Sequence, residues 1–217
     1  MTKAKLLQSL IRDGYLKTPS VTQAFERIDR KKFVRESEKE YAYLNSALPI
    51  GHEQTISQPL VVAFMLELLE PKKGEKILEI GSGSGWQTAL LADIVGTKGK
   101  ITAIERIPEL TQEAKKHLAR YPRLKTRFEM LDGDASKGYE PNAPYDKIIA
   151  AASTKKLPKE WKDQLKIGGY IVAPVRESIV RLEKKGANEF EKKEFYGFVF
   201  VPLISKPEGV DNPLDTK

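Results

Sequence analysis

Apolar and polar positions alternate in blocks along most of this chain. From residue 76 onward, short apolar runs predict strands at Lys76–Ile80, Lys100–Ile104, Arg127–Leu131, Tyr145–Ala151 and Tyr170–Val175. Between them, apolar residues at helical spacing predict helices at Trp86–Ile94, Pro108–Tyr121 and Pro158–Leu165. Strands that alternate with helices in this way predict a parallel sheet with right-handed crossovers.

The two ends of the chain follow other patterns. The first 50 residues read as helical, and a turn-rich segment leads to Ser57-Gln58-Pro59, which opens an almost wholly apolar helix at Leu60–Leu69. Near the other end, Ile179–Glu183 and Phe195–Leu203 read as strands with no helix between them, which predicts an antiparallel addition at the sheet edge. We expect one domain over 1–217, made of a helical and loop cap (1–56), a cofactor-binding core (57–175), edge strands (176–205) and a loose tail (206–217).

Three closely spaced glycines interrupt this pattern after the first core strand. Gly81, Gly83 and Gly85 stand between the strand that ends at Ile80 and the helix that starts at Trp86. Glycine permits a tight turn and lets a ligand approach the backbone, and the exposed amides lie at the start of the helix. In the dinucleotide-binding fingerprint, the third glycine stands one residue later than Gly85 does here. The glycines alone therefore do not identify the ligand, and the neighbouring residues have to be considered.

Acidic residues stand at three successive strand ends. Glu79 suits an ammonium group, Glu105 can accept hydrogen bonds from both ribose hydroxyls, and Asp134 can accept one from an adenine amino group. An ammonium, a ribose diol and an adenine without phosphate describe S-adenosylmethionine. The alternative is an ordinary tight turn accompanied by surface acids.

Composition narrows the chemistry. The 217 residues contain no cysteine and two histidines, which excludes disulfides, thiolate zinc sites, a cysteine nucleophile and a histidine-rich metal site, so we expect no metal. The net charge of +7 comes mostly from scattered lysines, which favour a solvated surface, with weak steering of acidic or nucleic-acid partners as the alternative. Neither a secretory signal nor a membrane-spanning stretch is evident, and we expect a cytoplasmic enzyme.

Taken together, these motifs resemble the protein-L-isoaspartate O-methyltransferase family over nearly the whole chain. The most specific segment is Gln54-Thr55-Ile56-Ser57-Gln58-Pro59, preceded by Leu48-Pro49-Ile50-Gly51. Further matching segments are the glycine loop with Gln87-Thr88, Gly133-Asp134, Gly138-Tyr139, Ala143-Pro144-Tyr145-Asp146, Asp163-Gln164-Leu165-Lys166, Gly168-Gly169, Pro174-Val175 and Phe200-Val201-Pro202-Leu203.

The resemblance implies a Rossmann-like α/β methyltransferase fold, with S-adenosylmethionine as cofactor and S-adenosylhomocysteine as product. It implies methylation of the free α-carboxylate of isoaspartyl residues in damaged proteins, carried out by a monomer. Ser57 falls at the active-site position. The residues implied to hold the cofactor are Gln54, Thr55, Ile56, Ser57, Glu79, Gly81, Gly83, Gly85, Glu105, Asp134 and Ala135. The peptide groove is expected beside Ser57, Ala151, Ala152, Val175 and Arg176.

This chemistry needs few side chains. A carboxylate is already a nucleophile at neutral pH, and exclusion of water with alignment of the reacting atoms supplies most of the effect. We therefore assign Ser57 a positioning role, in which its hydroxyl orients the carboxylate. The alternative is that Ser57 only caps the helix at Leu60.

Two departures from the family pattern bear on the substrate. Glu53 stands where the family commonly has a second glycine, and Arg176 follows Pro174-Val175 where a glycine is common. Arg176 could pair with a substrate carboxylate, or lie on a surface loop. The alternatives are therefore another acceptor, such as RNA or a small carboxylate, or an inactive homologue. Against base amines, Ala151-Ala152-Ser153-Thr154 replaces the Asn/Asp-Pro-Pro-aromatic motif of nucleic-acid amino methyltransferases.

Overall fold

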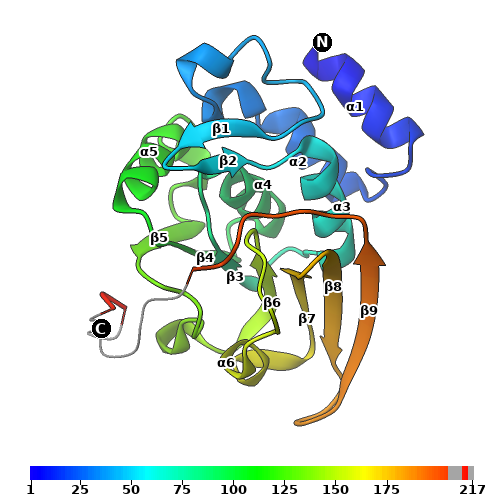
Figure 1. Cartoon of the computed structure of the whole chain (residues 1–217), viewed down its shortest axis with the longest axis vertical. Helices are drawn as coiled ribbons and strands as arrows, with labels where there is room; N and C mark the ends of the chain where they lie inside the picture. The colour runs from blue at the N-terminus through cyan, green and yellow to red at the C-terminus, as the bar shows by residue number, and fades with distance from the viewer. Residues whose placement is uncertain (205–211, 215–217) are drawn as a thin grey trace.

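A seven-stranded sheet organises the computed structural model, which describes residues 1–204 and 212–214 (Figure 1). The strand order is β5-β4-β3-β6-β7-β8-β9. The strands are β3 (Lys76–Ile80), β4 (Lys100–Glu105), β5 (Phe128–Asp132), β6 (Tyr145–Ala150), β7 (Leu165–Val175), β8 (Ser178–Lys184) and β9 (Phe190–Tyr196). The first five run parallel and the last two pair antiparallel. The predicted α/β fold with antiparallel edge strands is confirmed.

Helices lie on both faces of the sheet, but unequally. The α-helices are α1 (Lys3–Arg12), α2 (Pro19–Arg27), α3 (Pro59–Leu69), α4 (Trp86–Val95), α5 (Pro108–Leu118) and α6 (Lys159–Asp163), and the 3₁₀ turns are η1 (Arg30–Phe33), η2 (Glu36–Glu38), η3 (Pro122–Leu124) and η4 (Glu140–Asn142). Helices α1 to α5 build the larger core against one face. A smaller core, centred on Trp161 and Tyr145, covers the other. The predicted N-terminal helices are confirmed.

The final predicted strand is misplaced by the sequence pattern. Phe195–Leu203 was expected to be extended because it is apolar, but β9 covers Phe190–Tyr196. An edge strand pairs through its backbone, so the charged residues between Phe190 and Phe195 fit there. The apolar residues after Gly197 instead leave the sheet. Figure 1 shows this stretch crossing the ends of the central strands.

Ahead of the sheet, a small hairpin joins β1 (Leu48–Gly51) to β2 (Gln54–Ile56). Its turn residues His52 and Glu53 have φ of 51° and 58°, in the left-handed region. Both central residues of a type I′ turn adopt this conformation, which favours glycine and asparagine. The glycine common in the family at the place of Glu53 therefore has a conformational reason.

We predict that Glu53→Gly raises the free energy of unfolding by about 0.5–1 kcal/mol, because relief of the left-handed strain outweighs the added freedom of the unfolded chain. Chemical denaturation measures this. Glu53→Gln is the matched control, since it removes the charge but keeps the side chain, and its stability should equal that of the wild type. If Glu53→Gln were also more stable than the wild type, the gain in stability would come from removal of the charge and not from relief of backbone strain.

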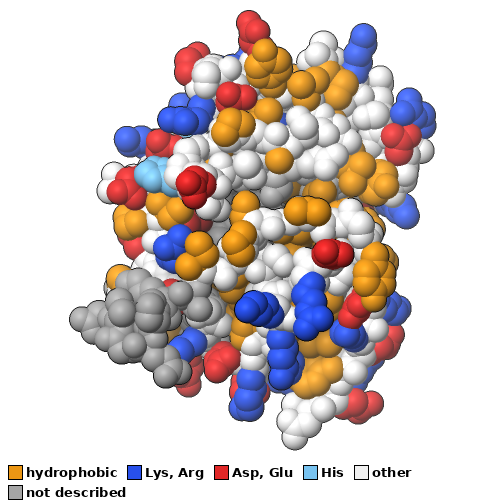
Figure 2. All heavy atoms as spheres, viewed as in Figure 1, with side chains coloured by type: hydrophobic (Ala, Val, Ile, Leu, Met, Phe, Trp, Pro, Cys, Tyr) orange, Lys and Arg blue, Asp and Glu red, His pale blue; other side chains and the backbone are white. Residues whose placement is uncertain are grey.

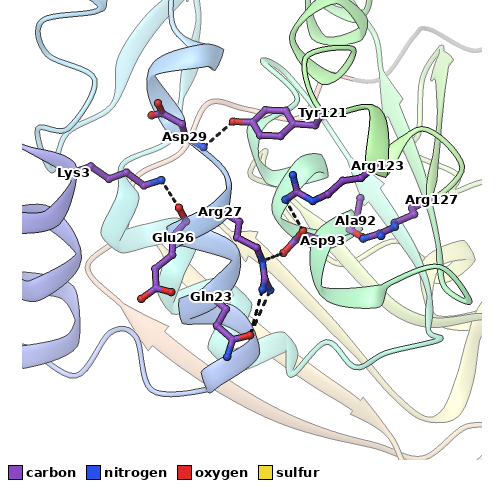
Figure 3. A network of polar contacts seen from close by, with 10 residues as sticks. All are labelled: Lys3, Gln23, Glu26, Arg27, Asp29, Ala92, Asp93, Tyr121, Arg123 and Arg127. Carbon is purple, nitrogen blue, oxygen red and sulfur yellow. Dashed lines mark hydrogen bonds and ion pairs between the residues drawn. The ribbon is translucent and has the colours of Figure 1, made fainter.

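Helices α2 and α4 are joined through one buried carboxylate (Figure 3). The two oxygens of Asp93 accept from Arg27 Nε and Arg123 Nη2, each at 2.8 Å. The Asp93 side chain is only 4% exposed, whereas its two arginine partners are about half exposed. This contact ties the N-terminal helices to the α4 side of the sheet.

The predicted loose tail, 206–217, lies mostly outside the described residues. Its described part, 212–214, packs on the loop after β5. Among the described helices, none has the length and apolarity needed to cross a bilayer. The division of the chain into cap, core and edge segments stays a prediction.

Candidate active site

A cavity of about 390 Å³ lies at the carboxyl ends of the parallel strands. Its floor comes from the ends of β3 and β4, and its upper wall from the β1–β2 hairpin. The segment that crosses after β9 closes a third side. The lining residues are Ala47, Gln54, Thr55, Ser57, Gln58, Val61, Ile80, Gly81, Gly83, Ile104, Glu105, Arg106, Ile107, Gly133, Asp134, Ala135, Ala151, Ala152 and 199–204.

The glycine loop is held tightly at the cavity floor. The amides of Gly81 and Ser82 both donate to the Ile104 carbonyl, at 2.9 and 3.2 Å. Gly85 has φ of 80° at the start of α4, and a side chain there would meet Ala114 Cβ at 3.1 Å. Gly85 therefore serves helix packing and is not among the cavity-lining residues, whereas Gly81 and Gly83 are.

Glu105 is fixed at the end of β4. It is buried, and its two oxygens accept from the Gly83 amide at 2.9 Å and from the Ile107 amide at 3.0 Å. The carboxylate thus connects the glycine loop to the start of α5. It also lines the cavity, where a carboxylate can accept from a pair of adjacent hydroxyls.

The loop after β5 is held from outside by the described tail residues. Asn212 accepts from the Asp134 amide and donates to the Asp134 carbonyl, both at 3.0 Å. A side chain on Gly133 would lie 2.5 Å from Leu214 Cγ, so this contact requires glycine. Asp134 and Ala135 face the cavity from this loop.

Glu79 differs in its surroundings from the other acids. It is fully buried, and its carboxyl accepts from Gln87 Nε2 at 3.1 Å and Thr88 Oγ1 at 2.6 Å. Burial raises the pKa of Glu79 from 4.5 to about 8, although both hydrogen bonds act to lower it. Glu79 is not among the cavity-lining residues, so its contact with a cofactor ammonium stays a prediction.

We predict that Glu79 makes the protein less stable as pH rises. The folded state holds the Glu79 proton until about pH 8, whereas the unfolded chain loses it near 4.5. Between these values the unfolded state binds fewer protons, so the free energy of unfolding falls with pH, by an amount on the order of 5 kcal/mol.

Denaturation of wild type and Glu79→Gln at pH 5 and pH 8.5 measures this. The stability of the wild type relative to Glu79→Gln should fall between the two pH values, since all other groups titrate alike. The exposed Glu113→Gln serves as control. A difference that stays constant with pH would contradict the prediction.

Ser57 follows the hairpin and faces the cavity. The alternative role, capping the next helix, is wrong. The cap of α3 is Gln58, which makes no side-chain cap bond. The amide of Leu60 instead donates to Asn45 Oδ1 at 3.0 Å. The Ser57 hydroxyl makes no hydrogen bond to any described residue, so it is available to a ligand.

The other predicted residues divide between the cavity and its surroundings. Gln54, Thr55, Ala151 and Ala152 line it, whereas Ile56, Val175 and Arg176 do not. Arg176 has φ of 53° in the tight turn between β7 and β8, and its amide donates to the Thr154 carbonyl at 2.9 Å. The glycine common at this place in the family therefore matches a left-handed turn. A contact of Arg176 with substrate stays a prediction.

Several residues of the site were not found from the sequence. The crossing segment 199–204 lines the cavity, and Val199 in it is 93% exposed. Its residues Phe200-Val201-Pro202-Leu203 match the family pattern, but the sequence assigned them no role in the site. In Figure 2, hydrophobic side chains gather in a band across the middle of the molecule. Arg30 and Asn212 also contact site residues by hydrogen bonds. Isolated arginines and asparagines give no periodic signal, so only three-dimensional contacts identify them.

Comparison with known proteins agrees with this geometry. The model of the family "Protein-L-isoaspartate(D-aspartate) O-methyltransferase (PCMT)" matches residues 1–208. A protein-L-isoaspartate O-methyltransferase from Ignicoccus hospitalis is 41% identical over 94% of this chain and 98% of its own. One from Methanopyrus kandleri is 39% identical over 97% and 94%.

A solved structure from Plasmodium falciparum, named provisionally as such an enzyme and in complex with S-adenosyl-L-homocysteine, is 24% identical, with a TM-score of 0.83 over 92% of this chain and 97% of its own. That likeness supports the fold. The family model and the two relatives cover nearly the whole chain. The chain therefore belongs to the protein-L-isoaspartate(D-aspartate) O-methyltransferase family.

Proposed function

We propose that this protein methylates the free α-carboxylate of L-isoaspartyl residues in damaged proteins and so starts their repair to aspartyl. One observation carries the proposal most. A single cavity joins Ser57 to Gly81, Gly83, Glu105 and Asp134. The relatives from Ignicoccus hospitalis and Methanopyrus kandleri bear the name of this activity.

The described residues fit S-adenosylmethionine as the cofactor. Glu105 presents a buried carboxylate to the cavity for a ribose diol. Asp134 stands on the next strand end, where an adenine amino group would meet it. The amides of Gly81 and Ser82 are taken by the Ile104 carbonyl and that of Gly83 by Glu105, so these amides are not directed at a phosphate. When bound, the cofactor supplies an electrophilic methyl group on a sulfonium.

The side chains around the cavity have modest tasks in this chemistry. When bound, S-adenosylmethionine would give its methyl group to the substrate carboxylate, and no side chain of this protein would need to move a proton. Ser57 orients the carboxylate by donating a hydrogen bond. Ile80, Ile104 and Val61 exclude water from that side of the cavity, which strengthens the alignment.

The experiment is methyl transfer from labelled S-adenosylmethionine to a short isoaspartyl peptide, with the aspartyl peptide of the same sequence as control. Transfer to the isoaspartyl form alone is expected. Binding of S-adenosylhomocysteine without transfer would overturn the proposal and direct attention to RNA or small carboxylates as acceptors. We also propose that the enzyme is a cytoplasmic monomer. Analytical ultracentrifugation, which measures the mass in solution, tests the monomeric state.

A further inference from the structure

Arg30 is a buried cation beside the active site. It is 2% exposed, and it belongs to η1, which precedes the hairpin. Its Nη1 donates to the Ala42 carbonyl at 2.6 Å, and its Nη2 to the Ser46 carbonyl at 3.0 Å. The same Nη2 donates to the Ser57 carbonyl at 3.1 Å. One side chain therefore holds three separate points of the chain.

The burial of Arg30 is costly. No carboxylate among the described residues forms an ion pair with it, and its Nε has no hydrogen-bond partner there. Burial lowers the pKa of Arg30 to about 10, which reports the lost hydration of the charge. A buried charge compensated by carbonyls alone is poor evidence of a gain in stability, because apolar residues of the same size often stabilise as well or better.

The contacts of Arg30 point to the two halves of the cavity. On one side it holds the carbonyl of Ser57, whose hydroxyl faces the cavity. On the other, its guanidinium lies 5.3 Å from the centroid of the Trp86 ring. Trp86 is the first residue of α4 and directly follows the glycine loop. Arg30 thus connects the segment that carries Ser57 to the helix that carries the loop.

The planar guanidinium suits this task. It presents its donors in a fixed fork, so the carbonyls that it binds are fixed relative to one another. A lysine ammonium is a point charge on a flexible stem and cannot bind the Ala42 and Ser57 carbonyls in the same fixed directions. The fixed geometry of its donors, rather than its positive charge, therefore explains why an arginine stands at position 30 without an acidic partner among the described residues.

We propose that Arg30 is a positioning residue for methyl transfer, which acts by fixing the backbone of Ser57 relative to the glycine loop. The inference rests on the proposed function. Because Arg30 does not line the cavity, it acts through Ser57 and touches neither ligand. It follows that its loss lowers turnover and leaves cofactor affinity nearly unchanged.

The test is a double-mutant cycle of Arg30→Lys and Ser57→Ala in the peptide assay. Methyl transfer by the wild type is measured first. If the wild type is inactive, the proposed function is contradicted, whatever the role of Arg30. We expect Arg30→Lys to lower kcat about tenfold or more, with Kd for S-adenosylhomocysteine within threefold of wild type. In the Ser57→Ala background, Arg30→Lys should lower kcat less than twofold, because the two changes remove the same alignment.

Arg12→Met is the control for charge, since the Arg12 side chain is 75% exposed. Arg30→Gln, which removes the charge and leaves one shorter amide donor group, serves as a second variant and should lower kcat at least as much as Arg30→Lys. Additive losses in the cycle would overturn the proposal. So would failure of both variants to keep a cooperative melting transition and to bind S-adenosylhomocysteine, because Arg30 would then be needed for folding alone.

Discussion

Glu105→Gln should weaken the binding of S-adenosylhomocysteine about 100-fold. The substitution removes two charge-assisted hydrogen bonds, and neutral hydrogen bonds replace them only in part. The carboxylate accepts from the amides of Gly83 and Ile107 while it faces the cavity. A glutamine offers one acceptor oxygen, and its amino group would face an amide donor. The glycine loop would then lose one of its fixed contacts as well as its ribose acceptor.

Calorimetric titration measures the change in Kd. Glu109→Gln is the matched control, because Glu109 lies exposed in the first turn of α5, four residues away, and loses the same charge. Its Kd should equal that of the wild type. If Glu105→Gln bound S-adenosylhomocysteine within threefold of the wild type, Glu105 would have a structural role only.

Ser57→Ala should lower kcat on an isoaspartyl peptide about 10-fold to 100-fold, which is the loss expected for one hydrogen bond to a charged group. The affinity for S-adenosylhomocysteine should stay within threefold. The melting temperature should not change either, because Asn45 and not Ser57 holds the first amide of α3. This combination separates positioning from helix capping, which would lower stability instead.

Initial-rate kinetics with the peptide and a thermal melt suffice for this test. Ser37→Ala, in the exposed η2 turn, makes the same chemical change away from the cavity and should behave as wild type. Wild-type turnover of Ser57→Ala would remove Ser57 from the mechanism, and the availability of its hydroxyl in the cavity would have no catalytic meaning.

Much of this fold could be predicted from the sequence, because the buried helices and strands have a clear pattern of apolar and polar residues. The strand Lys76–Ile80 has the predicted bounds, since its glycine loop ends it sharply. Helix α3 begins at Pro59, one residue before the expected start. Both elements are buried on most sides, so side-chain polarity reports their structure directly. The glycine loop and Glu105 were predictable for a related reason, because position at a strand end fixes where they lie.

The unpredicted parts depend on contacts between residues far apart in the chain. The β9 strand carries charges because its edge position exposes them, which polarity alone does not distinguish from a loop. The hydrogen bonds that Glu79 accepts from Gln87 and Thr88 were not predicted either, and the contact of Glu79 with a cofactor ammonium stays a prediction. Arg30 gives no local signal at all, since its four carbonyl partners lie 12 to 27 residues away.

The walls of the cavity also determine when a newly made chain can work. They come from six stretches that begin at Ala47 and end at Ile204. Ribosomal synthesis delivers the glycine loop long before the crossing segment 199–204. An incomplete chain therefore has an open groove in place of the cavity. Methyl transfer should begin only once the segment 199–204 has been synthesised and has folded over the cavity.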